Sequence, residues 1–189
     1  MGNRYVRMKR LIVAALLWAG FANAQDGPGY HQLRAEEFEG MPEFNRADVV
    51  AYTHCYIDFN YHAKSERGIY RLTAEVKLQF NRDKSWINKR KVFSTKMMDD
   101  ILDHEQGHYT IAYMEQQELI RDISRTRFDA NYQKEAEALF DRVHEKYRQL
   151  SADYDDDTAH MTNRNQQRSW DKYFQKRLAF MPPAEIASN

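Results

Sequence analysis

A strict alternation of apolar and polar side chains between residues 70 and 80 is the clearest pattern in the chain. Its apolar members are Tyr70, Leu72, Ala74, Val76, Leu78 and Phe80. Because successive side chains of a strand point to opposite faces, this pattern predicts a strand with one buried and one wet face. Val49 to Tyr61 is rich in β-branched and aromatic residues, and Ser65-Glu66-Arg67-Gly68 has the composition of a turn. The two segments predict an antiparallel hairpin, which needs a helix against its apolar face.

Helical spacing of the apolar residues replaces this alternation after residue 94. We expect a first helix from about Thr95 to about Ser124, with Ser94 as its N-terminal cap. A second helix is expected from about Phe128 to Leu150, and a third from about Asn165 to Phe180, just before Pro182-Pro183. The predicted fold class is α+β, with a small antiparallel β-sheet followed by a helical half.

The first 24 residues have the layout of a signal peptide. A basic start that includes Arg4 and Arg10 precedes an apolar run from Leu11 to Phe21, and Ala22-Asn23-Ala24 fits the small-x-small cleavage rule. The apolar run of about 11 residues is too short to span a bilayer, which needs about 20. We therefore expect a periplasmic or secreted protein, cleaved after Ala24 and without a stable membrane anchor.

The rest of the chain predicts one domain. Residues 25–47 are rich in Gly, Pro and charge and form an extended lead-in, residues 48–181 form the domain, and 182–189 are a tail. A mature chain of roughly 165 residues can build one good core but hardly two. Lys and Arg number 28, as do Asp and Glu, so the net charge gives no indication of a nucleic-acid partner. Cys55 is the only cysteine, which excludes an internal disulfide.

His104-Glu105-Gln106-Gly107-His108 carries the most specific chemistry in the sequence and falls within the first expected helix. Residues four apart share a helical face, so the two imidazoles can bind one metal ion. Glu105 lies about 100° around the helix from His104, where it can take a proton from water activated by the metal. The motif predicts a zincin-like helical half with Zn²⁺ as its cofactor. Gly107 costs about 1 kcal/mol against Ala and indicates close approach of another group.

Two buried histidines without a metal are the alternative interpretation. Ile101 and Ile111 share a stripe with His104 and His108, so the imidazoles face inward. Without a metal, each ring would need hydrogen-bonding partners of its own, and we therefore favour a metal site. A catalytic zinc usually has three protein ligands and an open position for water, so a third ligand must come from elsewhere in the chain.

Candidates for the third ligand lie downstream in two places. The segment from Tyr154 to His160 is expected to be a loop after the second helix, and it offers a histidine and three carboxylates. The second helix offers Glu135, Glu137 and Glu145, as in proteases whose third ligand is a glutamate on a following helix. Such acidic residues are often merely solvated, so composition leaves the choice open.

Two separated blocks of the chain resemble a known family. They are Leu102-Asp103-His104-Glu105-Gln106-Gly107-His108-Tyr109-Thr110-Ile111-Ala112 and Tyr154-Asp155-Asp156-Asp157-Thr158-Ala159-His160, followed by Gln166-Gln167-Arg168-Ser169-Trp170. On these blocks the chain is similar, from about Val49 to Trp170, to the domain-of-unknown-function 922 family, described as predicted secreted zinc-dependent proteases. The second block of the family resembles Tyr-Asp-x-x-Thr-x-His-Gly, and Met161 stands where Gly is typical.

The resemblance implies that His160 is the third metal ligand. Asp155 is the next candidate and the helical glutamates come last. Asp155 could instead accept the free ring N–H of a ligand histidine and orient that ring. Tyr154 is a candidate to hydrogen-bond an oxyanion, although a Tyr beside a helix end is more often a packing residue.

The sequence supports two main functional hypotheses. The first is an exported zinc-dependent metallopeptidase that hydrolyses a peptide or protein substrate with zinc-activated water and Glu105 as general base. The alternative is a non-catalytic zinc-binding envelope module for protein interaction or assembly. Such a site would normally use four protein ligands and would not need Glu105. A metal-free envelope interaction protein is a third possibility.

Overall fold

The computed structural model describes residues 29–43 and 49–181. The expected signal peptide and the tail at 182–189 lie outside the described residues. In the described part, strands come first and three long helices follow, which confirms the α+β class. None of the helices there combines the length and the apolar character needed to cross a membrane.

The predicted hairpin is present, and its strands continue closer to the turn than expected. β2 (Cys55–Glu66) pairs antiparallel with β3 (Ile69–Phe80), and every residue of one strand has a partner on the other. Arg67 and Gly68 form the connecting turn, both with positive φ, of 52° and 79°. A two-residue turn of this kind matches the natural twist of a hairpin, and Gly adopts its conformation without a steric cost.

The single strand expected from Val49 to Tyr61 is divided in two. β1 (Ala51–Tyr52) pairs antiparallel with β4 (Trp86–Ile87), so the described residues form two two-stranded sheets and not one. Between β1 and β2, the backbone N–H of His54 donates to Ser85 Oγ at 2.9 Å. This contact gives the backbone a partner where the chain passes from one sheet to the other.

The three expected helices are all present. They are α1 (Thr95–Arg125), α2 (Tyr132–Thr158) and α3 (Arg164–Phe180). Ser94 caps α1 as predicted, because its Oγ accepts a hydrogen bond from the backbone N–H of Met97 at 3.1 Å. A short 3-10 turn at Lys89–Lys91 precedes α1.

Both ends of α2 differ from the prediction. Phe128 lies outside the helix, where its backbone exchanges two hydrogen bonds with Tyr70 of β3. At the other end, the segment expected as a loop forms the last turns of the helix. Acidic residues oppose the dipole at a helix C-terminus, so the sequence suggested an earlier end. Tyr154 and Thr158 are completely buried one turn apart, and this tertiary packing extends the helix to a left-handed Ala159.

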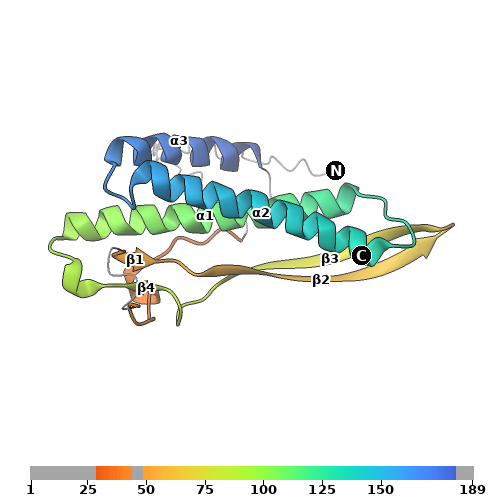
Figure 1. The fold of residues 1–189 in the computed structure, drawn as a ribbon, viewed down its shortest axis with the longest axis horizontal. Coiled ribbons are helices and arrows are strands. Elements are labelled where there is room, and N and C mark those ends of the chain that lie inside the picture. The colour runs from red at the N-terminus through yellow and green to blue at the C-terminus, as the bar shows by residue number, and fades with distance from the viewer. Residues whose placement is uncertain (1–28, 44–48, 182–189) are drawn as a thin grey trace, which may run out of the picture.

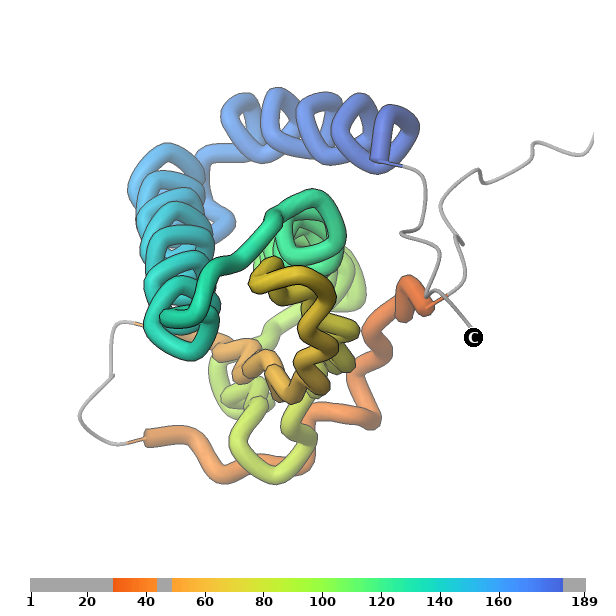
Figure 2. Tube along the Cα trace, turned by 90° about the vertical axis from the view of Figure 1, so that its right-hand side faces the viewer, coloured from red at the N-terminus to blue at the C-terminus, as the bar shows by residue number. Residues whose placement is uncertain are grey.

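α1 is the central element of the molecule. Figure 1 shows the helices lying lengthwise over the long hairpin, and the end-on view in Figure 2 places α1 between the hairpin and α3, with α2 alongside both α1 and the hairpin. One core joins β3 to all three helices through residues that include Val76, Met114, Val143 and Phe174. A second core packs β1 and β4 against α1. Because both sides of α1 are buried, its motif is held on a rigid support.

The described part of the lead-in belongs to the folded domain, although the sequence indicated only an extended segment. Leu33 and Phe38 are buried in the second core, around a 3-10 turn at Ala35–Glu37. Both polar atoms of the Gln106 amide on α1 hydrogen-bond to this segment. Oε1 accepts from the backbone N–H of Leu33 at 2.8 Å, and Nε2 donates to the Tyr30 hydroxyl at 2.9 Å. The lead-in segment therefore holds the middle of the motif in place through the Gln106 side chain.

Candidate metal centre

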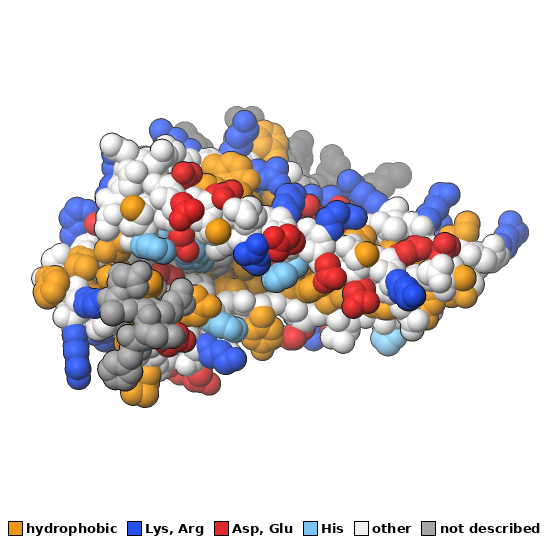
Figure 3. Space-filling view, viewed as in Figure 1, with side chains coloured by type: hydrophobic (Ala, Val, Ile, Leu, Met, Phe, Trp, Pro, Cys, Tyr) orange, Lys and Arg blue, Asp and Glu red, His pale blue; other side chains and the backbone are white. Residues whose placement is uncertain are grey.

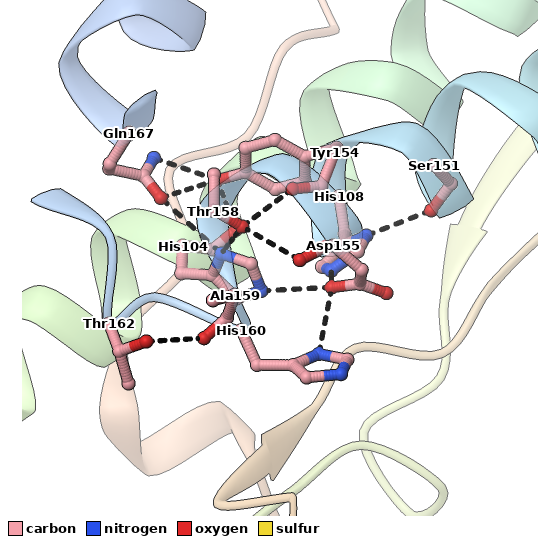
Figure 4. A network of polar contacts seen from close by, with 10 residues as sticks. All are labelled: His104, His108, Ser151, Tyr154, Asp155, Thr158, Ala159, His160, Thr162 and Gln167. Atoms are coloured by element: carbon pink, nitrogen blue, oxygen red, sulfur yellow. Dashed lines mark hydrogen bonds and ion pairs between the residues drawn. The ribbon is translucent and has the colours of Figure 1, made fainter. Parts of the chain in front are cut away.

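α1 directs two histidines toward α2 (Figure 4). His104 and His108 lie one helical turn apart, with ring centroids 4.9 Å apart and ring planes perpendicular. Both rings point Nε2 at the same atom, Asp155 Oδ1, at 3.1 Å and 3.0 Å respectively. The inward-facing seam predicted from the sequence is thus present, and it ends on a carboxylate from the neighbouring helix.

The antiparallel course of α2 brings Asp155 to this position. His108 meets Ser151 and His104 meets Asp155, so one turn along α1 matches one turn back along α2. Possible ligand atoms of His104, His108 and Asp155 all lie within 4.8 Å of one another. Two imidazoles and a carboxylate are ordinary ligands of transition metals, so these three residues could hold a metal ion.

The far side of each imidazole is fixed by a hydrogen bond. Gln167 of α3 donates from Nε2 to Asp171 at 2.9 Å, so its Oε1 faces Nδ1 of His104, at 3.3 Å. Nδ1 of His104 is therefore the donor, and Nε2 keeps its lone pair. Ser151 Oγ lies 2.9 Å from Nδ1 of His108 and can accept its N–H in the same way. Partners of this kind orient the ligand rings of metal sites.

This tautomer makes the cluster a good fit for a cation. With Nδ1 as the donor, a neutral ring presents a bare lone pair to the carboxylate oxygen of Asp155. Lone pairs that face one another at hydrogen-bond distance are unfavourable unless a positive charge lies among them. Either protons on the rings or a metal ion would supply that charge. The donor set and the ring orientation therefore both fit a bound metal.

Asp155 is strongly biased toward its charged form. Burial opposes ionisation, but the hydrogen bonds and the charge that protonated His104 and His108 rings supply outweigh it and hold the pKa of Asp155 well below its usual range. The carboxylate is therefore available as a ligand without the loss of a proton at neutral pH. A histidine ligand must in contrast stay unprotonated to bind metal.

Tyr154 occupies the core behind His104 and not the open side of the site. Its ring stacks on that of His104 at 4.8 Å, and its hydroxyl donates to the carbonyl oxygen of His104 at 3.1 Å. Nε2 of Gln167 donates to the same hydroxyl at 2.7 Å. Burial raises the pKa of Tyr154. This placement differs from the expected oxyanion contact: Tyr154 supports the position of His104 and Gln167.

The close approach of Tyr154 explains the glycine inside the motif. A Cβ built at Gly107 would lie 2.7 Å from Cε1 of Tyr154, and closer still to its Cζ and hydroxyl oxygen. Real side chains do not come this close, so any larger residue must displace the tyrosine ring. The cost of a helical glycine is thus offset by the packing of α2 against α1.

His160 stands at the mouth of the site. Its Nδ1 lies 3.2 Å from Asp155 Oδ1, the atom that both motif histidines face, and its side chain is 51% exposed. Ala159, His160 and Met161 all have positive φ, of 46°, 47° and 80°. Met161 therefore adopts a conformation that favours glycine, which accounts for the Gly typical of the family block. A strained turn of this kind fixes the direction of His160.

Glu105 lies beside the histidines in a cleft of about 320 Å³. It is 3% exposed, and its Oε2 has no hydrogen-bond partner among the described residues. The cleft is lined by α1, by α2 and by residues 49–55, and in Figure 3 histidine and acidic side chains gather along the boundary between α2 and the strands. A buried carboxylate with an unsatisfied oxygen can accept a proton from a molecule in the cleft.

Other candidates take no part in the cluster. Glu135 contacts Asp129, and Glu145 binds Arg148 at 2.6 Å. Together with Glu137, both lie outside the group of possible ligand atoms found among the described residues. Cys55 lines the cleft, but burial raises its pKa to about 12, so it is not a thiolate nucleophile.

Two residues of the site were not singled out from the sequence. Gln167 belongs to a block that resembles the family, but only the packing of α3 shows that it faces His104. Ser151 lies one turn before Asp155, and helical spacing would have indicated it had α2 been extended far enough.

The roles of Asp155 and His160 can be separated by metal affinity. We expect Asp155→Ala to weaken Zn²⁺ binding by more than about 100-fold, because Asp155 Oδ1 lies at the point where the imidazoles converge. His160→Ala should weaken it by about 10-fold or less, because that ring is half exposed and touches the cluster through one atom. Titration with a competing chelator measures both. The opposite order would make His160 the third ligand.

Fold and site together define an α+β protein whose central helix carries a His-Glu-x-x-His motif in a cluster able to hold a metal ion. The family model described as "Bacterial protein of unknown function (DUF922)" matches residues 26–161, and the chain belongs to this family. The match begins earlier than the expected Val49 and includes the blocks around His104 and Asp155, but ends before Gln166. Neither a curated protein nor a solved structure gives a significant match.

Proposed function

We propose that this protein is an exported zinc-dependent metallopeptidase. The observation that carries the proposal is the juxtaposition of Glu105, buried and with an unsatisfied oxygen, with His104 and His108 in one cleft. Export is supported by the leader-like residues 1–24, and a mature chain that begins at Met1 instead of Gln25 would contradict it.

The cluster supports zinc among the possible metals. Two histidines and one carboxylate also hold iron(II) in some oxygenases, so the donor set alone does not choose. A carboxylate next to the first histidine, on a helix with the second histidine one turn on, is the arrangement of zinc hydrolases. Zinc held by His104, His108 and Asp155 or His160 would lower the pKa of water and polarise the carbonyl to be cleaved.

The chain's own residues would perform the proton transfers. Glu105 accepts a proton from the attacking water through its free carboxylate oxygen and returns it to the leaving amine. Gln167 and Ser151 hold the motif histidines in the orientation that leaves Nε2 free. The apolar parts of the cleft reduce the water around Glu105, which strengthens its interactions with the reacting groups.

The alternative is a non-catalytic zinc-binding module for protein interaction or assembly. His160 is the observation that favours it, since four side chains converge on one point if His160 is included. Four protein ligands would leave no open position for water. The buried Glu105 argues against this alternative, because a closed structural site has no use for a free carboxylate beside it.

The experiment that tests the proposal combines metal analysis with hydrolysis. The purified mature protein is expected to contain about one zinc per chain and to cleave casein or members of a peptide library. Removal of zinc by a chelator should stop cleavage, and restored zinc should recover it. Zinc content without any cleavage would favour the non-catalytic module. Iron in place of zinc would overturn the assignment of the metal, and no metal at all would leave a metal-free interaction protein.

A further inference from the structure

A second pair of titratable side chains lies in the same cleft, away from the metal cluster. Glu115 of α1 and His144 of α2 both line the cleft, and their Oε1 and Nδ1 atoms are 2.8 Å apart. Glu115 is only 7% exposed, whereas the side chain of His144 is 55% exposed. A buried carboxylate therefore opens onto the cleft beside a histidine that reaches into solvent.

The packing between the helices does not require a carboxylate at this position. Nearby members of the core on the same two helices are apolar: Ile111, Leu119, Leu139 and Val143. Burial raises the pKa of Glu115, although the hydrogen bond with His144 opposes this effect. Burying a carboxylate costs free energy that an apolar residue would not cost. The feature is therefore better explained by a ligand than by stability.

The charges around the pair favour a cationic ligand. Arg148 is the one Lys or Arg among the described residues that line the cleft. Its guanidinium is already bound by Glu145, through two hydrogen bonds of 2.6 Å. A positively charged group that enters the cleft would therefore meet Glu115 with only His144 to displace.

The distance from the metal cluster fits an extended peptide. Glu115 lies seven residues after His108 on the same helix, which corresponds to about 10 Å along its axis. An extended chain covers this length in about three residues. Ala112, between the two positions, also lines the cleft, and its small side chain leaves room for a peptide along the floor.

We propose that Glu115, once His144 has been displaced from it, binds an ammonium or guanidinium group of the substrate, about three residues from the bond to be cleaved. The group is either a Lys or Arg side chain or the free N-terminal amine of a short peptide. That the bound molecule is a substrate rests on the proposed peptidase function, but the cation site itself can be tested by binding alone.

The test uses the full mature chain loaded with zinc and carrying Glu105→Gln, so that bound peptides are not cleaved. N-acetylated octapeptides with a single Lys moved along the sequence are compared by calorimetry with peptides that carry norleucine, an uncharged residue of similar length. We expect Lys to bind on the order of 10-fold more tightly than norleucine at one position or two adjacent ones. An advantage that appears only in peptides without the acetyl group would assign the site to the N-terminal amine.

Matched variants show which residue causes the preference for Lys. Adding Glu115→Gln to the Glu105→Gln protein should bring the Lys-to-norleucine ratio close to one. Glu118→Gln is the control, since Glu118 lies on the same helix and is bound by Lys146 but does not line the cleft; it should leave the ratio unchanged. Equal binding of the Lys and norleucine peptides would overturn the proposal even if Glu115→Gln failed to fold. A preference for Lys that persists in a folded Glu115→Gln protein would overturn it as well. A wild-type chain that shows the cation preference but cleaves nothing would reject the peptidase and retain this site.

Discussion

Glu105→Gln is expected to abolish hydrolysis while zinc binding and folding stay unchanged. The amide has the size of the carboxylate, so it fits the same buried position beside His104 and His108. It cannot accept a proton from water, and loss of a positioned base lowers kcat by about 100-fold to 10,000-fold. A buried charge with an unsatisfied oxygen is also removed, so stability should not fall.

The measurement is kcat/KM for one peptide, with zinc content and thermal unfolding determined on the same samples. Glu118→Gln serves to show that the loss is specific to position 105, because it changes a carboxylate of the same helix that does not line the cleft. Its zinc content should equal that of the wild type. Near-normal turnover in zinc-loaded Glu105→Gln would remove Glu105 from the role of base.

Gly107→Ala is expected to destabilise the protein and weaken its metal site together. In an exposed helix this substitution is stabilising by about 1 kcal/mol, so destabilisation would reverse the normal sign. The added Cβ must push the Tyr154 ring away from α1, and overpacking of this kind costs about 1–3 kcal/mol. The Tyr154 ring stacks on the His104 ring, so the His104 ring and its hydrogen-bond partner Gln167 would shift as well.

The decisive comparison is the coupling free energy between substitutions at Gly107 and Tyr154. Tyr154→Ala alone should cost about 3–5 kcal/mol, because it empties a fully buried site. In the double variant the two losses should not add, since the smaller residue at 154 makes room for the Cβ at 107. Denaturant unfolding of the four proteins, with and without zinc, measures the coupling. Additive losses, or a Gly107→Ala protein as stable as the wild type, would show that the contact does not constrain the motif.

Local patterns in the sequence predicted the elements that depend on local chemistry. The alternation at residues 70–80 predicted β3, and Ser94 marked the start of α1, because period and capping are read from neighbouring residues. The His-Glu-x-x-His motif together with helical spacing indicated the two histidines and Glu105. The family resemblance adds Asp155 as the second candidate for the third ligand, after His160.

Features that depend on distant parts of the chain could not be predicted in this way. The last turns of α2 carry acidic residues that are locally unfavourable, and only the burial of Tyr154 and Thr158 against other helices stabilises them. For the same reason the sequence leaves open whether the Tyr154 hydroxyl faces the core or an oxyanion. The direction of the Tyr154 side chain depends on whether residue 154 lies in a loop or in a helix. In the helix, the side chain packs against α1 at Gly107, where there is space for its ring.

The position of α3 has a practical consequence for the boundaries of the protein. The family match ends at residue 161, before α3 begins, yet Gln167 and Phe174 on that helix are buried against the motif helix and α2. A chain cut after Met161 would lose the acceptor that fixes the His104 ring, and it would uncover the side of Tyr154 that Trp170 and Phe174 contact. The region that the family model matches is thus shorter than the unit that folds. Recombinant versions should therefore extend through residue 181.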